Sequence, residues 1–560
     1  MRAPLVKGMG SIIRIFHLSA FLYAVTLILQ ATLFAQVAHA NDDSTANPGE
    51  AIYRNGVLSS GKSLEAIRAG GVHMKGADAA CVNCHQRSGL GSKEGFISIP
   101  PITGQYLFNE SGSAADLDLP YVENMRAERN PYTDETLARA IRDGIDSQGR
   151  PLDYLMPRFV LGDADMASLI GYLKQMDHHE VPGVTDTVLH FATIITPDAD
   201  PIKREGMLDV LQHFFADKNI FPLGATPRLR STHKWHFMVN RRWKLHIWEL
   251  SGPPETWQAQ LDQDFAREPV FAVISGLGGK TWAPIHKFCE QKEVPCLFPN
   301  VEAPPLDADH DYYSLYFSKG VELEAKLIAN RILNPESGKT AKVVLQIYRK
   351  GDNGESASKV LSQSLDSHGV KVKTIVLPAG KLGEGVAKAL HHAPRTDALV
   401  LWLRPADIET LGKEPAAPAG IFMSGMMGGL EQSPLPSSWR SSTHIAYPFA
   451  LPGERRVNVD FAFGWFTIRH IPVVAKQVQA DTFLACSLLA ETLHHMVDTF
   501  VPDYLIERVQ DMLDNRIITG YYPHLSLATN QRFASKGGYI VHFTQPDGTK
   551  LAADSKWIVP

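Results

Sequence analysis

Two cysteines and a histidine lie within five residues of the stretch "DAACVNCHQRSGLGS", residues 78–92. Cys81 and Cys84 enclose two residues, and His85 follows at once. This spacing is typical of covalent haem attachment, in which both thiols add to the porphyrin and the histidine binds the iron. A zinc site needs a second ligand pair, which the chain lacks, and a thioredoxin-like dithiol needs no histidine. The sequence therefore predicts one covalently attached haem c.

A second axial ligand for the iron is expected further along the chain. Met156 is followed by Pro157, whose fixed φ favours a stiff loop that presents the thioether. Met125 and His73 remain the alternatives for this position. A histidine and methionine pair leaves no open iron position, so such a haem passes single electrons and does not readily activate oxygen or peroxide.

Helices are predicted on both sides of the Met-Pro loop. The segment "GEAIYRNG" reads as a short helix, and "NPYTDETLARAIRDGID" as a longer one that Thr133 caps and Gly144 ends. A third helix is expected from Asp163, because apolar residues recur after it at helical spacing. Its predicted buried side chains are Met166, Leu169, Ile170 and Leu173.

Residues 41–176 resemble a class I single-haem cytochrome c domain. The resemblance is carried by the C-x-x-C-H motif, the apolar loop "IPPITG", the Met-Pro loop and the flanking helices. It implies an all-α domain in which Cys81 and Cys84 hold the haem by thioethers. It also implies that His85 and Met156 are the axial ligands of the haem iron.

The N-terminus and the bulk composition set further limits. Residues 1–40 combine early basic residues, an apolar run and the small-residue pattern "AHA", which predicts a cleaved signal peptide and a periplasmic protein. An uncleaved membrane anchor is the alternative, and only then would the chain contact a membrane. A net charge of −5 gives no indication of nucleic-acid binding. At 560 residues the chain exceeds a single core, so several domains are expected.

After a polar linker, residues 177–186, strand-like and helix-like segments alternate through residues 187–560. Alternation of this kind predicts parallel sheets covered by helices. Because this region is too long for one sheet, we expect two α/β lobes. The fold class predicted for the chain is therefore multidomain, with an all-α domain followed by a two-lobed α/β region.

This region resembles the type I periplasmic binding proteins, in the group of branched-chain amino-acid receptors associated with transporters. The segments that carry the resemblance include "PVFAVISGLGG", "VPCLFPNVEAPP" and "VVLQIYRKGDNGESAS". It implies a small-molecule ligand between the lobes, at the carboxyl ends of strands and at helix N-termini. The implied ligand-binding residues are Ser275, Gly276, Gly278, Gly279, Lys280 and Thr281, and the loop after Pro299 and the turn near Ser318 to Gly320 are further implied ligand positions. The glycines have a second interpretation, a tight strand-to-helix turn.

Three functions follow from these features. The chain is interpreted first as an exported electron carrier that works with a periplasmic redox partner protein. The alternatives are a ligand-binding receptor or sensor with an accessory haem, and an oxidoreductase whose haem accepts electrons from a small substrate. No dinucleotide or P-loop motif is present, so an enzyme is the weakest of the three. Cys289 and Cys296 either form a disulfide or remain two buried thiols, and the sequence leaves this open.

Overall fold

The protein is described by a computed structural model. It describes residues 47–94, 97–108, 129–176, 180–220, 241–305, 311–335, 338, 340–380, 382–394, 396–413, 420–496, 499–528 and 530–560. The predicted signal peptide, Met125 and the first part of the linker lie outside these residues. The chain divides into a first unit, Met1–Asn83 with Thr133–Leu173, and a second unit, Cys84–Tyr132 with Lys174–Pro560. The predicted boundaries at 41–176 and 187–560 stay a prediction.

The helices of the first unit begin and end at the predicted signals. Asn47 accepts a hydrogen bond from Gly49 N at 3.0 Å and starts α2 (Pro48–Asn55). Thr133 and Thr136 form a reciprocal capping box at α5 (Asp134–Asp143). The last helix, α6 (Asp163–Gln175), buries the four apolar side chains that the periodicity predicted. Gly49 allows α2 to approach α6, because a Cβ there would lie 2.1 Å from Ser168 O.

A small antiparallel sheet accompanies these helices. Among the described residues its strand order is β2 (Val72–Lys75), β1 (Glu65–Arg68) and β5 (Arg158–Val160). The prediction of an all-α domain missed this sheet, because strands of three or four residues are too short to show a period of two. The short α3 (Val82–His85) carries the end of the C-x-x-C-H motif. Three elements of the second unit follow α3 along the chain. They are β3 (Ser92–Glu94), β4 (Ile97–Ile99) and α4 (Gly104–Phe108).

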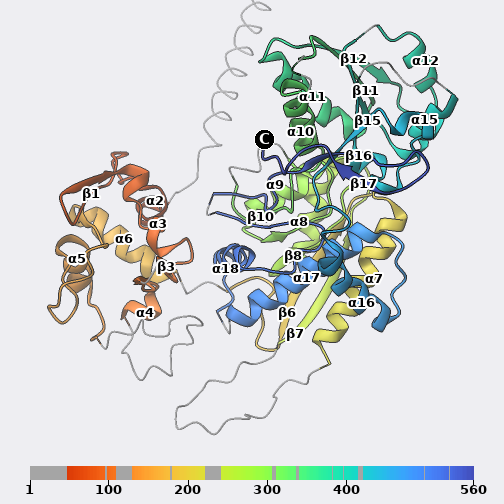
Figure 1. The fold of residues 1–560 in the computed structure, drawn as a ribbon. Helices are drawn as coiled ribbons and strands as arrows, with labels where there is room; N and C mark the ends of the chain where they lie inside the picture. Colours follow the sequence, from red (N-terminus) through yellow and green to blue (C-terminus); the bar gives the residue numbers. More distant parts are fainter. Residues whose placement is uncertain are drawn as a thin grey trace, which may run out of the picture. The chain divides into compact units, whose positions relative to one another are not determined.

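The second unit contains two α/β lobes, as predicted (Figure 1). We call the first of them lobe 1. In the described part of the chain its sheet is entirely parallel, in the order β10-β9-β8-β6-β7. The strands are β6 (Val188–Ile195), β7 (Arg242–Glu249), β8 (Ala272–Ile274), β9 (Cys296–Leu297) and β10 (Ser314–Leu315).

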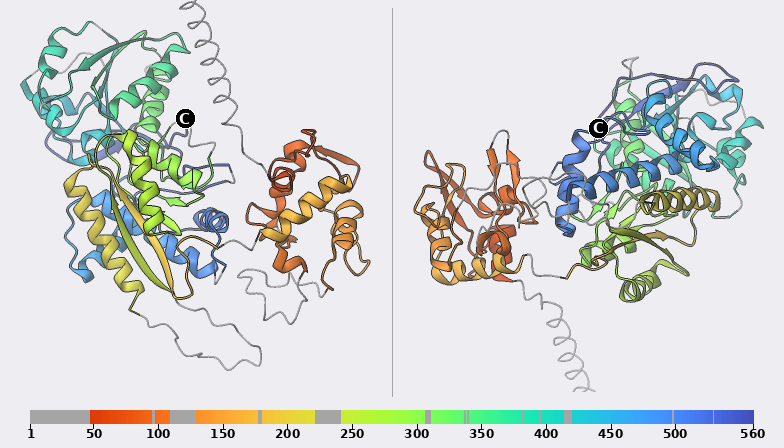
Figure 2. Two further views of the ribbon diagram at one scale, coloured as in Figure 1. Left: turned by 180° about the vertical axis from the view of Figure 1, so that it is seen from behind. Right: turned by 90° about the horizontal axis from the view of Figure 1, so that it is seen from below.

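Helices cover both faces of the lobe 1 sheet, which explains why β6 reads as a nearly continuous apolar run. On one face α7 (Pro201–Lys218) and α17 (Lys476–Met496) pack against Phe191 and Ile195. On the other, α8 (Trp257–Arg267) and α9 (Ala283–Gln291) pack against Ala192 and Ile194. Figure 2 shows this layering from two further directions, with α7 in yellow and α17 in blue. The helices α16 (Arg456–Arg469) and α18 (Pro502–Asp514) pack beside α17.

Lobe 2 has a larger sheet, whose order within the described residues is β12-β11-β13-β14-β15-β16-β17. Neighbouring strands are parallel from β12 to β15 and antiparallel beyond it. The strands are β11 (Val343–Arg349), β12 (Lys371–Leu377), β13 (Ala398–Trp402), β14 (Gly420–Ser424), β15 (Thr443–Tyr447), β16 (Tyr539–Phe543) and β17 (Leu551–Ala553). The helices are α10 (Val321–Leu333), α11 (Gly354–Asp366), α12 (Val386–His391), α13 (Pro405–Ile408), α14 (Gly425–Gly428) and α15 (Ser437–Arg440).

The chain crosses between the lobes in segments that pair with one another. The crossing after β10 pairs with the crossing before β16, where Ser535 N donates to Phe317 O at 2.7 Å. The crossing after β15 joins the latter through Ala450 N and Tyr521 O, 2.9 Å apart. Lobe 1 is thus discontinuous in sequence, because α16, α17 and α18 return to it after most of lobe 2 is complete.

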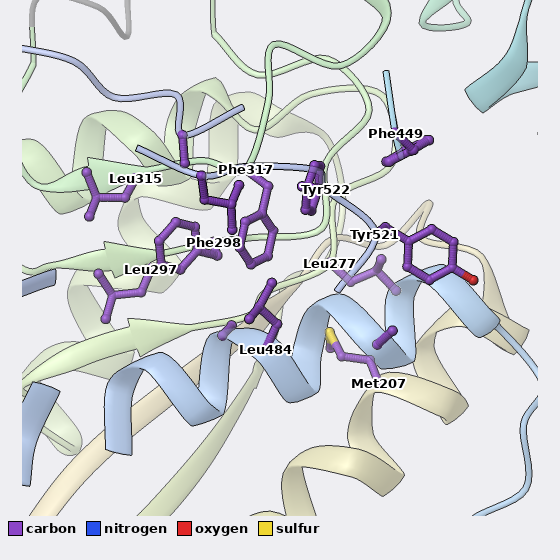
Figure 3. Close-up of a cluster of buried hydrophobic side chains, with 14 of the residues drawn as sticks. Met207, Leu277, Leu297, Phe298, Leu315, Phe317, Phe449, Leu484, Tyr521 and Tyr522 are labelled. Atoms are coloured by element: carbon purple, nitrogen blue, oxygen red, sulfur yellow. The ribbon is translucent and has the colours of Figure 1, made fainter. Parts of the chain in front are cut away.

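Aromatic side chains from the crossings fill the space between the lobes beside α17 (Figure 3). The rings of Phe298 and Phe317 stack with centroids 4.4 Å apart, and Tyr522 continues the stack 5.2 Å from Phe317. Phe449 lies 5.6 Å from Tyr522 and Leu484 of α17 packs below. Such buried aromatic contacts hold the crossings together as a single apolar hinge.

Candidate functional site

The end of the C-x-x-C-H motif is built to present an imidazole nitrogen. His85 is buried at the end of α3, and its Nδ1 lies 3.0 Å from the backbone oxygen of Pro100. A carbonyl oxygen only accepts, so Nδ1 carries the proton and Nε2 keeps its lone pair. Burial lowers the pKa of His85 to about 4, although the hydrogen bond to Pro100 raises it. The histidine is therefore neutral at pH 7, as an iron ligand must be.

The other predicted haem residues are placed as follows. Cys81 and Cys84 are partly buried, Cys81 immediately before α3 and Cys84 within it. Met156 belongs to the first unit, where it lies half-buried in the turn before β5 and donates its amide to Asp153 O at 3.1 Å. Its neighbour Pro157 is buried, and the alternative ligand His73 is exposed on β2. The haem and the assignment of these residues to it stay a prediction.

The glycines of the predicted ligand loop have a packing reason. The loop follows β8, and Ser275 at its start is buried with a φ of 48°. A Cβ at Gly276 would lie 2.4 Å from the Trp282 ring, and one at Gly278 would lie 2.9 Å from the same ring. The glycines therefore allow the indole to close over the loop. This supports their second interpretation as a tight turn into α9.

Side chains of the protein itself already bind the backbone amides of this loop. Gly279 N donates to Thr196 Oγ1, and Lys280 N donates to Asp198 Oδ2, each at 2.9 Å. Thr281 Oγ1 accepts from the first amide of α9 at 3.3 Å. The Asp198 carboxylate thus stands where the resemblance places an anionic group of a ligand. The assignment of Ser275–Thr281 as ligand-binding residues stays a prediction.

Beside the loop, three polar side chains hydrogen-bond one another. Ser275 Oγ donates to Thr482 Oγ1 of α17 at 2.8 Å. Asn300 Nδ2 donates to Ser275 Oγ at 2.9 Å, and also lies 3.4 Å from Thr482 Oγ1. Because Ser275 and Thr482 are fully buried, these bonds remove the desolvation cost of their hydroxyl groups. Asn300 lies in the predicted ligand loop after Pro299, whereas sequence reasoning missed Thr482.

A charged network joins the two lobes a short distance away. We call Lys203, Glu302, Asp352, Asn353 and Arg404 the interlobe network. Glu302 accepts from Lys203 Nζ at 3.0 Å, from Asn353 Nδ2 at 2.9 Å and from Arg404 Nη2 at 2.7 Å. Burial alone would raise the pKa of Glu302, but the charges of Lys203 and Arg404 outweigh it and hold the pKa well below its usual range.

The guanidinium of Arg404 also binds Asp352 with two nitrogens. Nε lies 2.9 Å from Oδ2 and Nη2 lies 2.6 Å from Oδ1. Such a fork is the strongest arrangement of an arginine and a carboxylate. Asn353 reaches back to the ligand loop, with Nδ2 3.4 Å from Gly279 O. Lys203 and Gly279 belong to lobe 1, and Asp352, Asn353 and Arg404 to lobe 2, so the network bridges the lobes.

The network lies where the topology of both sheets places a ligand site. In lobe 1 the strand order reverses between β6 and β8, and in lobe 2 between β11 and β13. Ligands of open α/β sheets bind at such switch points, beyond the carboxyl ends of the strands. Asp198 and the glycine loop follow β6 and β8, while Asp352 and Arg404 follow β11 and β13. Both switch points therefore meet in one group of interacting residues.

The chain is similar to solved two-lobed binding proteins. A leucine-binding protein from Thermotoga maritima shares 12% identity over 66% of this chain and 99% of its own, with a TM-score of 0.48. A periplasmic substrate-binding protein from Ralstonia solanacearum has 11% sequence identity over 65% of this chain and 100% of its own, with a TM-score of 0.49. A substrate-binding protein of a fatty-acid transporter from Thermomonospora curvata has 12% sequence identity over 68% of this chain and 95% of its own, with a TM-score of 0.49. No protein-family model and no curated protein matches.

These likenesses carry no information on function, and the two-lobed architecture rests on the sheets and crossings described above. Within the described residues, no group of three or more histidine, cysteine, aspartate or glutamate side chains is arranged to hold a metal ion. No helix in the same part of the chain is both long and apolar enough to cross a membrane.

A sequence signal exists for the charged residues of this site, of which Glu302 lies in the predicted ligand loop after Pro299. Asp198, Glu302, Asp352 and Arg404 each follow a buried strand by a few residues, in "TPDAD", "PNVE", "RKGD" and "LWLRP". Charged residues at the carboxyl ends of several parallel strands gather at one edge of a sheet. The pattern indicates a shared polar site, although it does not indicate which charges pair.

Proposed function

We propose that this chain is an exported receptor for a small polar solute, bound between the lobes, with an accessory haem. The observation that carries the proposal is the meeting of both topological switch points in the interlobe network. Because the network is balanced between cations and carboxylates, an entering solute has to exchange for internal ion pairs. A charged or strongly polar molecule replaces such pairs at lower cost than an apolar one. The N-terminal segment and the haem motif support export.

The backbone amides of the loop 275–281 would bind the carboxylate of a solute, so carboxylate probes test this proposal. Thermal unfolding of the full chain would be followed with L-leucine and, separately, with octanoate, both of which carry a carboxylate. We expect at least one probe to raise the Tm, since a ligand at 100 times its Kd stabilises the folded state by about 2.7 kcal/mol. In Asp198→Ala the amide of Lys280 is released, so the response to the carboxylate should grow.

The matched control is Asp209→Ala, which removes a carboxylate from the same lobe on α7 without touching the loop. Its response should equal that of the wild type. If neither probe shifts the Tm of the wild type or of Asp198→Ala, the proposal loses its support.

Single-electron transfer is the second candidate, favoured by the orientation of His85 through Pro100 O. Cys81 and Cys84 would hold the haem, and His85 with Met156 would bind its iron. A haem with these ligands supplies one-electron exchange with a redox partner protein. The role of the chain is to bury the imidazole, keep it neutral and fix its tautomer.

The haem assignment is tested by pigment retention in denaturing gels and by spectroscopy. We expect Cys84→Ala to lose covalent haem. We expect Met156→Ala to keep it but to shift towards a high-spin spectrum, because a ligand has been removed. Met125→Ala is the control and should leave the spectrum unchanged. Loss of the low-spin spectrum in the control alone would transfer the ligand role to Met125.

A further inference from the structure

Two buried cysteines lie on adjacent elements of lobe 1. Cys289 is on α9 and Cys296 is in β9, and both have 0% of their surface exposed. In the structure both are free thiols, and burial, together with the neighbouring Cys296, raises the pKa of the Cys289 thiol. Sequence separation did not decide whether the two side chains share one environment, and the fold places both in the same buried apolar cluster.

The backbone holds this pair in place independently of the sulfur chemistry. Val294 N donates to Cys289 O at 2.9 Å and closes the turn that follows α9. Glu293 in that turn takes a positive φ of 53°. Cys296 N donates to Tyr313 O at 2.9 Å, and Cys296 pairs with Val273 of the neighbouring strand. Backbone hydrogen bonds therefore fix the end of α9 and the start of β9 without a covalent bond between the sulfurs.

The surroundings of the pair shield it from solvent. Cys289 and Cys296 belong to an apolar cluster with Trp248, Phe288 and Tyr316. Tyr316 Oη lies 2.8 Å from His286 Nδ1, and His286 Nε2 lies 2.6 Å from Asp311 Oδ2. Of this hydrogen-bonded chain only Asp311 has substantial side-chain exposure, at 38%. A dissolved reagent therefore has no direct approach to either sulfur in the folded lobe.

We propose that Cys289 and Cys296 form a disulfide in the exported protein and fasten α9 to β9. Two S–H bonds break and one S–S bond forms. The two protons and the two electrons pass by exchange to the disulfide of a protein thiol oxidant, whose S–S bond breaks to give two thiols. Because both sulfurs are inaccessible in the folded lobe, the exchange takes place before lobe 1 closes.

The inference uses the export part of the proposed function and is independent of ligand binding and of haem. Disulfides persist in oxidising compartments and are rare in reducing ones. The helix that the bond fastens begins directly after the loop 275–281, so the bond limits movement at the edge of the candidate site. Cys486, alone and buried on α17, remains a thiol and serves as an internal standard.

Peptide mapping decides the question. Full-length protein, exported and purified without reductant, would be denatured with iodoacetamide present and digested with trypsin. Cleavage after Lys287, Lys292 and Lys319 separates the two cysteines into the peptides 288–292 and 293–319. We expect these peptides to be joined by a disulfide, while Cys486 is alkylated. Alkylation of Cys289 and Cys296 to the same extent as Cys486 would overturn the proposal.

Two further samples serve as controls. Protein made without residues 1–40 in a reducing cytoplasm should yield both peptides alkylated. Reductant should lower the Tm of the exported wild type by a few degrees, and it should leave the Tm of the exported double variant Cys289→Ser, Cys296→Ser unchanged. A failure of leucine or octanoate to bind would count against the receptor function and would leave the linked peptides unaffected.

Discussion

Asp481 is a carboxyl group whose ionisation the fold opposes. It lies on α17 with 4% of its surface exposed, and Oδ2 accepts one hydrogen bond from Tyr522 Oη at 3.2 Å. Burial raises its pKa to about 7, and the bond to Tyr522 lowers it only in part. At neutral pH this group is therefore divided between its charged and uncharged forms, beside the apolar hinge.

Stability should fall with rising pH because of Asp481. Its pKa is about 7 in the folded protein and about 4 in the unfolded chain, so the folded state binds the proton more tightly. The free energy of unfolding then decreases between these two pH values, by up to about 4 kcal/mol. Asp481→Asn keeps an oxygen for Tyr522 and cannot ionise. In urea unfolding at pH 5 and pH 8, the variant should lose less stability than the wild type.

Each protein serves as its own control, because its stability at pH 8 is compared with its stability at pH 5. Other buried carboxyl groups, such as Glu324 with a pKa raised by burial to about 8, titrate equally in both proteins. An identical loss of stability in wild type and variant would mean that Asp481 does not ionise in this range.

At the scale of elements, the junction of β8 and α9 depends on contacts with the loop after β6. Asp198 satisfies the amide of Lys280, and Gly279 leaves room for its carboxylate. Trp282 closes over the other two glycines. The junction therefore combines a local requirement for small residues with a partner that is 82 positions away in sequence.

Gly279→Ala should destabilise the protein. The added Cβ would lie 2.3 Å from the Asp198 carboxylate and would displace it from the amide of Lys280. Loss of a hydrogen bond to a charged group costs about 2 kcal/mol. Gly464→Ala is the matched control, since it lies in α16 with open space around it, and it should gain about 0.5–1 kcal/mol. Equal unfolding midpoints for both variants would contradict this role of Gly279.

At the scale of the whole second unit, the interlobe network opposes opening of the lobes without a ligand. Its side chains come from both lobes, and the central pair is mostly buried, with Glu302 at 16% and Arg404 at 23% exposure, whereas Lys203 is more exposed at 38%. Together with the apolar hinge, these ion pairs connect the two lobes. Opening the lobes requires that charges be separated and rehydrated.

Arg404→Met should loosen the lobes. The change leaves Glu302 with the charge of Lys203 and the hydrogen bond from Asn353, and it removes the guanidinium that binds Asp352. We expect a cost of about 3 kcal/mol in unfolding free energy. Small-angle X-ray scattering should show a larger radius of gyration than for the wild type. Arg204→Met breaks only the exposed pair with Glu249 and should cost less than about 1 kcal/mol. Equal radii of gyration for the two variants would show that Arg404 does not hold the lobes together.

The sequence by itself determined the local elements. Thr133, Gly144 and the period of apolar residues after Asp163 predicted helices that the structure confirms, because caps and helical periodicity depend on residues a few positions apart. The alternation of β6, α7 and β7 predicted the parallel sheets in the same way. The C-x-x-C-H motif is also local, so its chemistry was predicted from residues 81–85 alone.

Only the tertiary structure decided which distant residues meet. Lys203 and Glu302 lie 99 positions apart, and Glu302 and Arg404 lie 102 apart. Their pairing depends on strand order and on the crossings, which bring α16, α17 and α18 back to lobe 1 after lobe 2. No local pattern encodes these distances, because they result from how whole sheets and helices pack.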